Sequence, residues 1–465
     1  MRRLMLPVVV AVVALMLGGA SAATSAKSAQ GPWVVADLGG VPGLAFSVAV
    51  AINERGQVIG NSYPCRTSFE CAAAGAFFWQ KGHLIRLGTL GGKWTEARDL
   101  NDSGQVVGYG TTRSGNNHAF LWQKGALTDI GTLPGRRESM ATDINERGQV
   151  VGISYSEDRD CGSVYQAVCD ARAFLWQHGK LTDLGTLGGA SSTAVAINDR
   201  GQVTGSSATG AKVALDSGRA CSGSDAAGCV TATHAFLWQK GRISDLGTLP
   251  AHTISNSASA VNGRAQVVGT SFWASGGNGE DTRPFLWQNG KMVDLGTLLT
   301  RPGAPSGDDP SPTVHAINAR GQVIGQVRAA DGGALHAILW QNRSLVDLAA
   351  LGHLGGQSDT SAINDRSQII GFGYSKTDDY GSPTDARSVV WESGKMTGLA
   401  TLAGGRNGRA VAMNEHDQIV GSSTTKASVT PSYGRCGTPA DRSARLQLVV
   451  RTSGGTLLAS VVTGS

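Results

Sequence analysis

Residues 118–135 read HAFLWQKGALTDIGTLPG, and this stretch decides how the rest of the chain is interpreted. An apolar run ends in Trp122, a Gln-Lys-Gly turn follows, and the segment DIGTLPG completes it. Seen alone, His118 and Asp129 suggest the edge of an active site. Close variants of the stretch recur along the chain, however, and a recurrence of this kind indicates a repeat architecture. The tryptophans that end the apolar runs are Trp79, Trp122, Trp176, Trp238, Trp287, Trp340 and Trp391, and an eighth run, LVVR at 448–451, places Arg451 where a tryptophan is expected.

A second motif, A-x-x-[IVLM]-N-x-x-x-Q-[VI]-x-G, precedes each of these runs. It occurs eight times, with Val314 and Thr360 in place of the first alanine in two copies. Its asparagines, which follow one another at intervals of 44 to 64 residues, are Asn53, Asn101, Asn145, Asn198, Asn262, Asn318, Asn364 and Asn414. A glutamine stands four residues after each asparagine. Because an asparagine side chain can hydrogen-bond the backbone two residues on, we interpret the pair as a clamp that holds a hairpin turn.

Each unit is expected to form four short antiparallel strands. The alanine-rich run before the asparagine is strand one, QVVG begins strand two, AFLW is strand three and LTDLG is strand four. The turn between strands one and two needs a positive φ at its last position, which a glycine such as Gly56 adopts most easily. Asp417 is an acceptable substitute. Ala265 and Ser367 are poor ones, and they predict that their two turns differ from the others.

Four-stranded antiparallel units at this spacing are typical of β-propeller blades. The predicted fold class is therefore all-β, a β-propeller of four-stranded antiparallel blades, with eight blades expected and seven plus a stray unit as the alternative. AFLW is apolar at consecutive positions, as expected of a strand that is buried on both faces between neighbouring blades.

The ring has two candidate ways to close. Residues 34–40, VVADLGG, have the sequence of a strand four with no strand three before them, so they are candidates to pair with the degenerate last unit. In the alternative, residues 455–462 close the last blade and the N-terminal segment is only an edge.

The N-terminus predicts export. Arg2 and Arg3 precede the apolar run 4–17, and Ala20-Ser21-Ala22 matches a signal-peptidase site, so residues 1–22 are expected to form a secretory signal peptide. Residues 23–32 follow as a flexible segment, and 33–465 form a single propeller of eight repeats. We expect a secreted, extracellular monomer without a membrane span. A formal net charge of +5 with no Lys/Arg cluster argues against a nucleic-acid partner.

The seven cysteines fit this compartment. Close cysteine pairs in an exported chain form small disulfide-closed loops, and the predicted pairs are Cys65 with Cys71, Cys161 with Cys169, and Cys221 with Cys229. Metal ligation is the weaker alternative, because no second pair or histidine stands at zinc-site spacing. Cys436 is left as a free thiol or an intermolecular link.

These residues resemble the HAF extracellular repeat family, which is named for the His-Ala-Phe that begins strand three. HAF stands intact at 118–120 and 234–236, with the variants RAF at 172–174, RPF at 283–285 and HAI at 336–338. The resemblance covers essentially the whole mature chain. It implies an exported, propeller-like repeat protein, and it brings no established activity or catalytic residues with it.

Residues that recur from unit to unit are interpreted as architecture. The position of His118 is held by arginine in several other units, so we expect this side chain to hydrogen-bond a neighbouring blade. Asp129 and its equivalents are expected to accept backbone N–H bonds in their turn, and the tryptophans of strand three to pack between blades. Trp94 and Trp273 lie outside the repeat frame and are predicted, as loop residues, to be aromatic groups of a ligand-binding face.

No catalytic, cofactor-binding or metal-binding residue is assigned, and no cofactor is expected. The chain has no GxSxG elbow, no HExxH motif and no sialidase-type Asp box. The predicted function is an exported non-catalytic binding or scaffold module for a protein or glycan at the cell envelope. Its binding face is expected to comprise the variable loops 61–76, 153–172, 206–233, 270–283, 372–387 and 422–443.

The alternative function is a carbohydrate-active hydrolase or lyase with acidic residues in the propeller loops. The acidic groups available for it there are Glu157/Asp158/Asp160, Asp308/Asp309 and Asp378/Asp379.

Overall fold

The computed structural model describes residues 33–41, 44, 46–63, 75–156, 170–214, 229–250, 255–274, 280–295, 313–328, 335–349, 357–374, 385–402, 405, 407–424, 444–453 and 456–457. The predicted signal peptide, the acidic groups of the loops and Cys65, Cys71, Cys161, Cys169, Cys221 and Cys436 lie outside these residues. Cys229 begins a strand, but its predicted partner does not belong to the described part, so the three disulfides stay predictions.

The described residues confirm an all-β fold built from four-stranded antiparallel sheets. The strands of the first four units are β2 (Phe46–Ile52), β3 (Val58–Tyr63), β4 (Gly75–Gln80), β5 (His83–Arg86); β6 (Gly91–Leu100), β7 (Val106–Thr112), β8 (Asn117–Gln123), β9 (Ala126–Gly131); β10 (Glu138–Ile144), β11 (Val150–Tyr155), β12 (Arg172–Gln177), β13 (Lys180–Asp183); β14 (Ser192–Ile197), β15 (Val203–Ala214), β16 (Cys229–Gln239) and β17 (Arg242–Asp245). The strands of the next three are β18 (Ser255–Val261), β19 (Val267–Ala274), β20 (Glu280–Gln288), β21 (Lys291–Asp294); β22 (Thr313–Ile317), β23 (Val323–Arg328), β24 (Leu335–Gln341), β25 (Ser344–Asp347); β26 (Gln357–Ile363), β27 (Ile369–Tyr374), β28 (Arg387–Glu392) and β29 (Lys395–Gly398).

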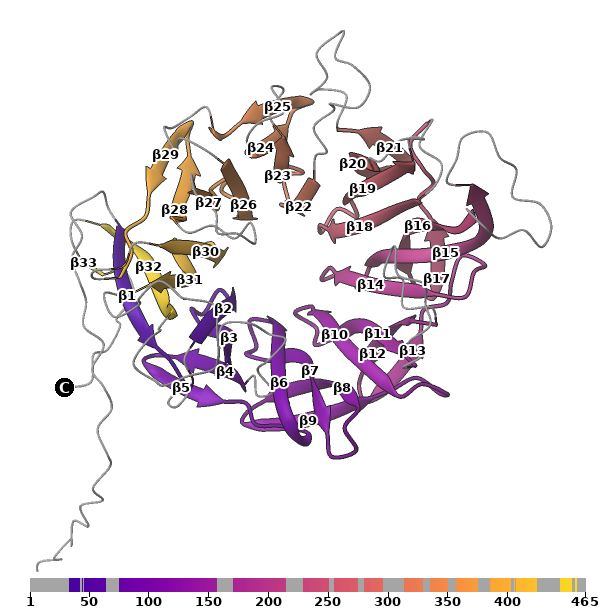
Figure 1. Ribbon diagram of the computed structural model, residues 1–465, viewed down its shortest axis with the longest axis horizontal. Helices are drawn as coiled ribbons and strands as arrows, with labels where there is room; N and C mark the ends of the chain where they lie inside the picture. Colours follow the sequence, from indigo (N-terminus) through magenta and orange to yellow (C-terminus); the bar gives the residue numbers. More distant parts are fainter. Residues whose placement is uncertain are drawn as a thin grey trace, which may run out of the picture.

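The last sheet contains both ends of the described chain. Its strands run in the order β30 (Gly408–Met413), β31 (Gln418–Thr424), β32 (Ala444–Ser453) and β1 (Trp33–Gly39), and the two-residue β33 (Thr456–Leu457) pairs with the end of β32. Hydrogen bonding divides the described strands into seven sheets, because a parallel bridge between Thr233 and Ser255 joins the fourth and fifth units into one eight-stranded sheet. Figure 1 shows the sheets arranged around a central axis, with strand one of each unit innermost.

Strand three is buried on both faces, as its sequence predicts. In β8, Phe120 and Trp122 pack in a cluster with the first unit, whereas Ala119 and Leu121 pack in a cluster with the third. The structure contains eight such clusters of buried side chains, and each one combines residues of two units that follow one another around the ring. The interleaved packing of apolar strands therefore holds each sheet to the next.

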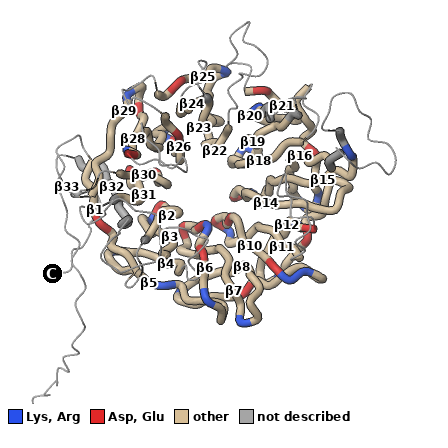
Figure 2. The backbone as a smooth tube through the Cα atoms, viewed as in Figure 1, with Lys and Arg blue, Asp and Glu red and all other residues tan. Residues whose placement is uncertain are grey.

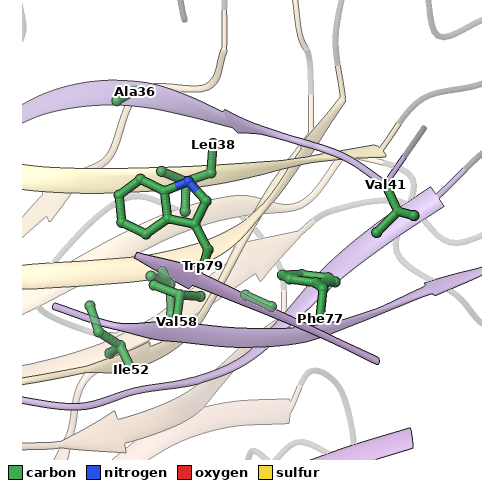
Figure 3. Close-up of a cluster of buried hydrophobic side chains, with 9 residues drawn as sticks. Ala36, Leu38, Val41, Ile52, Val58, Phe77 and Trp79 are labelled. Atoms are coloured by element: carbon green, nitrogen blue, oxygen red, sulfur yellow. The ribbon is translucent and has the colours of Figure 1, made fainter. Parts of the chain in front are cut away.

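The first strand completes the last sheet, so the predicted role of residues 34–40 is confirmed. β1 pairs antiparallel with β32 from Trp33 opposite Arg451 to Gly39 opposite Leu446. Asp37 Oδ1 accepts a hydrogen bond from Gly39 N at 2.8 Å, as the DLG aspartates of other units do. Figure 3 shows the consequence, with Leu38 of β1 lying beside Trp79 of the first unit in one buried cluster.

The register of β32 corrects one sequence assignment. In the second unit, Trp122 pairs with Val106, the first valine of QVVG. In the last unit the equivalent residue Ile419 pairs with Val449. Val449 therefore stands at the tryptophan position, and the prediction that Arg451 does so is wrong. The backbone pairing with β31 sets the register, and the apolar run of this degenerate unit extends one residue, Val450, past the equivalent position.

The asparagine–glutamine clamp is confirmed, and it also links the units. Asn53 Oδ1 accepts hydrogen bonds from Arg55 N and Gln57 N, at 3.1 and 2.9 Å, and Asn53 Nδ2 donates to Gln57 Oε1 at 2.6 Å. The same Nδ2 donates to the carbonyl of Asn101 in the following unit at 2.9 Å. Seven such inter-unit bonds, 2.8–3.1 Å long, run around the axis, and the last joins Asn414 to the carbonyl of Asn53.

The turns at Ala265 and Ser367 do not differ from the others, so that prediction is wrong. Ala265 and Ser367 adopt φ values of 62° and 69°, close to the 70° of Gly56. Ala265 N and Ser367 N donate to the carbonyls of Asn262 and Asn364, as Gly56 N does to Asn53. The clamp and the inter-unit bonds of the asparagine hold the turn in this geometry, even where the residue itself disfavours it.

We therefore expect Ala265→Gly and Ser367→Gly to stabilise the protein. A left-handed conformation costs an L-residue about 1–2 kcal/mol, and the greater freedom of glycine in the unfolded chain offsets about 0.4–1 kcal/mol of this gain. The net gain should be roughly 0.5–1 kcal/mol for each change, measured as a rise in the denaturant midpoint. Gly56→Ala is the reverse control and should lower the midpoint, because its Cβ would lie 2.9 Å from Gln418 Oε1.

Candidate functional site

The inner strands carry a recurring bulge, and two units depart from the repeat at that point. In every unit the pairing between strands one and two shifts between the residues four and two positions before the asparagine, so that the residue three before it is bulged. A bulge of this kind changes the direction of the neighbouring side chains, and bulges are common beside active sites. The residue after the bulged one is alanine in six units, at Ala51, Ala196, Ala260, Ala316, Ala362 and Ala412. In the adjacent second and third units it is Asp99 and Asp143.

The two aspartates meet between β6 and β10. Ile144 N lies 3.1 Å from Asp99 Oδ2 and 2.8 Å from Asp143 Oδ1, so one N–H group points at both carboxyl groups. Asp143 Oδ2 also accepts a hydrogen bond from Ile197 N in the fourth unit at 2.7 Å. The shared N–H group thus brings the two carboxyl groups together, so that a protonated Asp99 can donate a hydrogen bond to Asp143. Both residues are half-buried, so part of their surface still meets solvent.

The surroundings of Asp99 favour the protonated form of its carboxyl group. Burial raises the pKa of Asp99 well above the ordinary range of an aspartate, and the charge of Asp143 and its hydrogen bond raise it further. The backbone N–H groups of Ile144 and Leu100 act in the opposite direction. Two carboxyl groups that share one proton form an acid–base pair, because like charges this close cannot both ionise easily.

A cluster of aromatic and charged side chains lies on the same strand, next to this pair. Arg98 Nη2 lies 3.2 Å from Glu96 Oε1, and it donates to Tyr109 Oη, also at 3.2 Å. Tyr109 Oη in turn donates to Glu96 Oε2 at 3.1 Å. The rings of Trp94 and Tyr109 are perpendicular, with centroids 5.3 Å apart. Figure 2 shows acidic and basic residues close together on the inner side of the ring in this region.

The phenols of this cluster are held in their protonated form. Burial raises the pKa of Tyr63 to about 12, and the charge of Glu96 adds to the effect. Burial is also the largest cause of the raised pKa of Tyr109. Burial acts to lower the pKa of Arg98, but Glu96, Tyr109 and Tyr63 together outweigh it, so the pKa of Arg98 is raised. The cluster therefore combines one cation, one anion and two neutral hydroxyl groups.

A third group of polar residues lies on the inner strands of the sixth to eighth units. His315 Nδ1 is 3.0 Å from the carbonyl of Thr360 and 3.4 Å from Asp359 Oδ1. Burial raises the pKa of Asp359, whereas the charges of His315 and Arg409 act against the rise. Arg409 lies over the ring of Phe372, 4.3 Å from its centroid. Here the described groups are already paired with one another, and no two carboxyl groups meet.

The acidic residues that follow the asparagines are structural. Glu54 accepts a hydrogen bond from Glu415 N, Asp102 accepts one from Glu54 N, and Glu146 accepts one from Asp102 N. Each carboxylate thus caps the turn of the preceding unit. Because the pattern repeats around the axis, it belongs to the architecture of the ring.

The predicted ligand-face aromatics are on strands, so their assignment to loops is wrong. Trp94 lies within β6 and Trp273 within β19, where it pairs with Asp281. Strands one and two extend past the repeat motif in these units, and backbone pairing converts the expected loop segments into strand. Trp94 is nevertheless half-buried rather than enclosed, and it belongs to the cluster next to Asp99.

The histidines of strand three bond within their own sheet, which corrects their predicted partner. His118 Nδ1 lies 2.8 Å from Asp129 Oδ2, and His234 and His336 contact Asp245 and Asp347 in the same way. The physical reason is the hairpin register, which places strand three beside the aspartate of strand four rather than beside another blade. The predicted role of that aspartate is confirmed, because Asp129 Oδ1 accepts a hydrogen bond from Gly131 N at 2.7 Å.

His118→Ala should therefore have a small effect. A partly exposed pair of this kind contributes about 0–1 kcal/mol, and three other units contain a His–Asp or Arg–Asp pair at the same place. We expect a change in the unfolding free energy of less than about 1 kcal/mol in urea unfolding. A larger loss of unfolding free energy would mean that the His118–Asp129 pair stabilises more of the protein than the hairpin in which it lies.

Sequence reasoning missed the aspartate pair, although a signal was present. The residue two positions before the asparagine is alanine in six of the eight motif copies. In the other two, DLNDSGQVVG and DINERGQVVG, it is aspartate. Only the fold places these two positions side by side. No group of three or more His, Cys, Asp or Glu side chains that could hold a metal ion occurs in the described ranges. In the same ranges no helix is long and apolar enough to span a membrane.

The comparisons with known proteins concern the fold. No protein-family model matches the chain, and no curated protein matches it. The β-propeller domain of the Trilobed protease from Pyrococcus furiosus is similar over 77% of this chain and 96% of its own, with 8% identity and a TM-score of 0.46. The acylaminoacyl peptidase of Pyrococcus horikoshii matches over 83% of this chain, with 11% identity and a TM-score of 0.43. The sialidase of Trypanosoma rangeli matches over 88%, with 10% identity and a TM-score of 0.35.

These matches correct the predicted function. The chain spans 58% of the acylaminoacyl peptidase and 55% of the sialidase, and both are enzymes. Prolyl endopeptidases and a dipeptidyl peptidase match as well. The prediction of a non-catalytic binding or scaffold module is contradicted by these enzyme matches.

Proposed function

We propose that the protein is a carbohydrate-active hydrolase or lyase whose acid–base group is the Asp99–Asp143 pair. The observation that carries the proposal is the replacement of alanine by aspartate at one position in two adjacent units, where the two carboxyl groups meet. The acids are on inner strands rather than in the loops where sequence reasoning placed them. A pair in two neighbouring units cannot serve the repeat as a whole, because six units do without it.

The raised pKa of Asp99 suits this chemistry. Cleavage of a glycosidic bond needs a carboxylic acid that is still protonated near neutral pH, so that it can protonate the leaving oxygen. Asp99 is the donor in this proposal. Asp143, which accepts hydrogen bonds from two backbone N–H groups, takes a proton from the attacking water and so restores the pair, or it orients the donor. Both residues keep a small exposed part, which supports access for a substrate.

The neighbouring cluster favours a glycan over other substrates of a carboxyl pair. Trp94 and Tyr109 provide aromatic rings, and Arg98 and Glu96 provide a cation and an anion in reach of the same hydroxyl group. Sugars have both apolar ring faces and hydroxyl groups that donate and accept. A site with these side chains therefore complements a sugar ring.

The test is turnover of a polysaccharide panel by the purified mature chain. We expect new reducing ends from at least one polysaccharide, and we expect Asp99→Asn and Asp143→Asn to prevent their release. Asp129→Asn is the matched control, because Asp129 is a repeated structural aspartate. This variant should cleave the polysaccharide at the native rate. Absence of product with every polysaccharide, or full activity of Asp99→Asn, would contradict the proposal.

We further propose that the ring is a closed propeller of eight blades and that the protein is secreted as a monomer. Eight buried clusters around the axis, the pairing of β1 with β32 and the bond from Asn414 to Asn53 support the count and the closure. The signal-peptide sequence and the resemblance to HAF repeats support export. Cleavage after Ala22, read from the N-terminus of the secreted protein, tests the second part.

A further inference from the structure

The cluster beside Asp99 has a composition that selects among sugars. Arg98 forms its ion pair with Glu96, and it also lies over the ring of Tyr109, 5.2 Å from the centroid. Its charge is therefore already matched by Glu96. The remaining polar groups, Tyr63 and Tyr109, are neutral phenols. The cluster as a whole has no net charge.

A ligand carboxylate is disfavoured at this place. It would stand close to Glu96 and to the Asp99–Asp143 pair, and like charges at short range in a half-buried site repel strongly. The guanidinium of Arg98 would have to leave Glu96 to bind it, which leaves a half-buried anion without its partner. Hydroxyl groups have neither problem, because they can donate to Glu96 and accept from Arg98 while the ion pair persists.

The aromatic rings give the same subsite an apolar surface. Trp94 meets Tyr109 at 89°, a perpendicular contact that leaves Trp94 a ring face not covered by Tyr109. Trp94 is half-buried, so the ring is held in place while part of it meets solvent. Apolar C–H faces of sugar rings pack on such a surface, and large rigid aromatic groups dominate binding energy at this kind of contact.

The bulge on β6 links the cluster to the acid pair. The pairing with β7 shifts between Ala97 and Asp99, so Arg98 is the bulged residue and Asp99 follows it directly. Arg98 and Asp99 are therefore neighbouring residues at the bulge of β6, where Arg98 is exposed and Asp99 is partly buried. A sugar ring held by Arg98 and Trp94 would lie next to the proton on Asp99.

We infer that Trp94, Glu96, Arg98 and Tyr109 form the subsite for an uncharged sugar ring, and that the substrate is a neutral polysaccharide. The inference rests on the proposed function and narrows it. Elimination by a lyase uses a carboxylate on the sugar to acidify the ring C–H that is removed. A neutral sugar has no such group, so the reaction is hydrolysis, in which the glycosidic C–O bond breaks, its oxygen takes a proton and water supplies the hydroxyl group.

The experiment measures binding separately from turnover. Titration calorimetry of the native chain and of Asp99→Asn compares neutral oligosaccharides, such as β-1,4-linked glucose and mannose oligomers and α-1,4-linked glucose oligomers, with oligogalacturonate. We expect a neutral series to bind both proteins, and we expect oligogalacturonate to bind at least about tenfold more weakly, a difference of ~1.4 kcal/mol. Trp94→Ala should weaken binding of the neutral series by roughly 10- to 100-fold, as loss of an aromatic binding anchor does.

Control variants separate the subsite from general disruption. Tyr374→Ala removes an aromatic residue in the seventh unit that stacks on Phe372, and it should leave binding unchanged. Glu96→Gln leaves Arg98 without its anion, so it should improve binding of oligogalacturonate relative to the neutral series. Stronger binding of oligogalacturonate by the native chain, or unchanged binding by Trp94→Ala, would overturn the inference.

The outcomes distinguish the inference from the function on which it rests. Turnover that needs Asp99, combined with tighter binding of oligogalacturonate, keeps the proposed function and overturns the neutral subsite. Binding of neutral oligosaccharides that needs Trp94, with no turnover of any polysaccharide, keeps the subsite and overturns the proposed function. Loss of binding in Tyr374→Ala as well as in Trp94→Ala would place the ligand elsewhere on the ring, and so contradict the subsite.

Discussion

Deletion of residues 33–39 is expected to abolish cooperative folding of the ring. These residues are β1, which completes the last sheet beside β32. Trp33, Val35 and Leu38 are each less than 9% exposed. Burial of three such side chains stabilises a fold by about 1.5–3 kcal/mol each, or roughly 5–9 kcal/mol together. A whole domain is stable by only about 5–15 kcal/mol, so the loss is comparable with the total.

The deletion also uncovers the first unit. Ala36 and Leu38 of β1 pack against Phe77 and Trp79 in the cluster that joins the last sheet to the first. Without β1, one edge of β32 and one apolar face of the first unit meet solvent. Unpaired edges of this kind lead to aggregation. We expect soluble aggregates in size-exclusion chromatography and no sharp thermal transition.

A rescue variant keeps this prediction specific. Residues 33–39 moved to follow Ser453, through a Gly-containing turn like those between strands three and four, should restore the native transition. The strand is then supplied from the other end of the same sheet. A deletion variant that unfolds cooperatively at the native temperature would contradict the role of β1 in closure.

Asp99→Asn should lower turnover and raise stability at the same time. Loss of a general acid reduces the rate by roughly 10²–10⁴-fold. Asparagine keeps an oxygen that accepts from Ile144 N and adds an amide group that donates to Asp143. The variant thus reproduces the hydrogen bonds of the protonated acid without its ionisation. A loss of activity through misfolding would instead lower stability.

The pH dependence of stability follows from the direction of the pKa shift. The pKa of Asp99 is raised in the folded protein, so the protonated form stabilises the fold. This contribution is fully present below the unfolded-state pKa of about 3.9 and is lost as the pH rises through the raised folded-state pKa. The unfolding temperature of the native chain should therefore fall, relative to that of Asp99→Asn, as the pH increases. A constant difference across this range would show that Asp99 does not titrate as the structure requires.

Much of the fold follows from the sequence, because a repeated pattern leaves few alternatives. Consecutive apolar residues in AFLW can be buried only between two sheets, and VVADLGG has no strand three of its own. The clamp between Asn53 and Gln57 also follows, since both residues recur in all eight units. These features are local or periodic, and each copy supports the interpretation of the others.

The errors arise where contacts across strands override local preference. Backbone pairing places Val449 at the tryptophan position and turns the expected loop around Trp94 into strand. The asparagine clamp holds Ala265 in a left-handed conformation that its side chain disfavours. Local sequence contains no information about these partners, since they come from other strands.

The candidate site was missed for a related reason. Asp99 and Asp143 are 44 positions apart and look like variants of an alanine-rich strand. Only the order of the units around the axis makes them neighbours and brings their carboxyl groups to the same N–H group, that of Ile144. Sequence reasoning sought function in the variable loops, whereas the described residues place the unusual chemistry on the inner strands.

The pH profile of hydrolysis tests the central claim most directly. The rate at which the native chain releases reducing ends from its best neutral polysaccharide is measured across the pH range, beside Asp99→Asn and Asp129→Asn. Because a general acid works only while protonated, the native rate and that of Asp129→Asn should fall as the pH rises through the raised pKa of Asp99. Asp99→Asn should be roughly 10²–10⁴-fold slower and should lack this fall. An Asp99→Asn profile that matches the native one in height and shape would show that the pair is not the acid–base group.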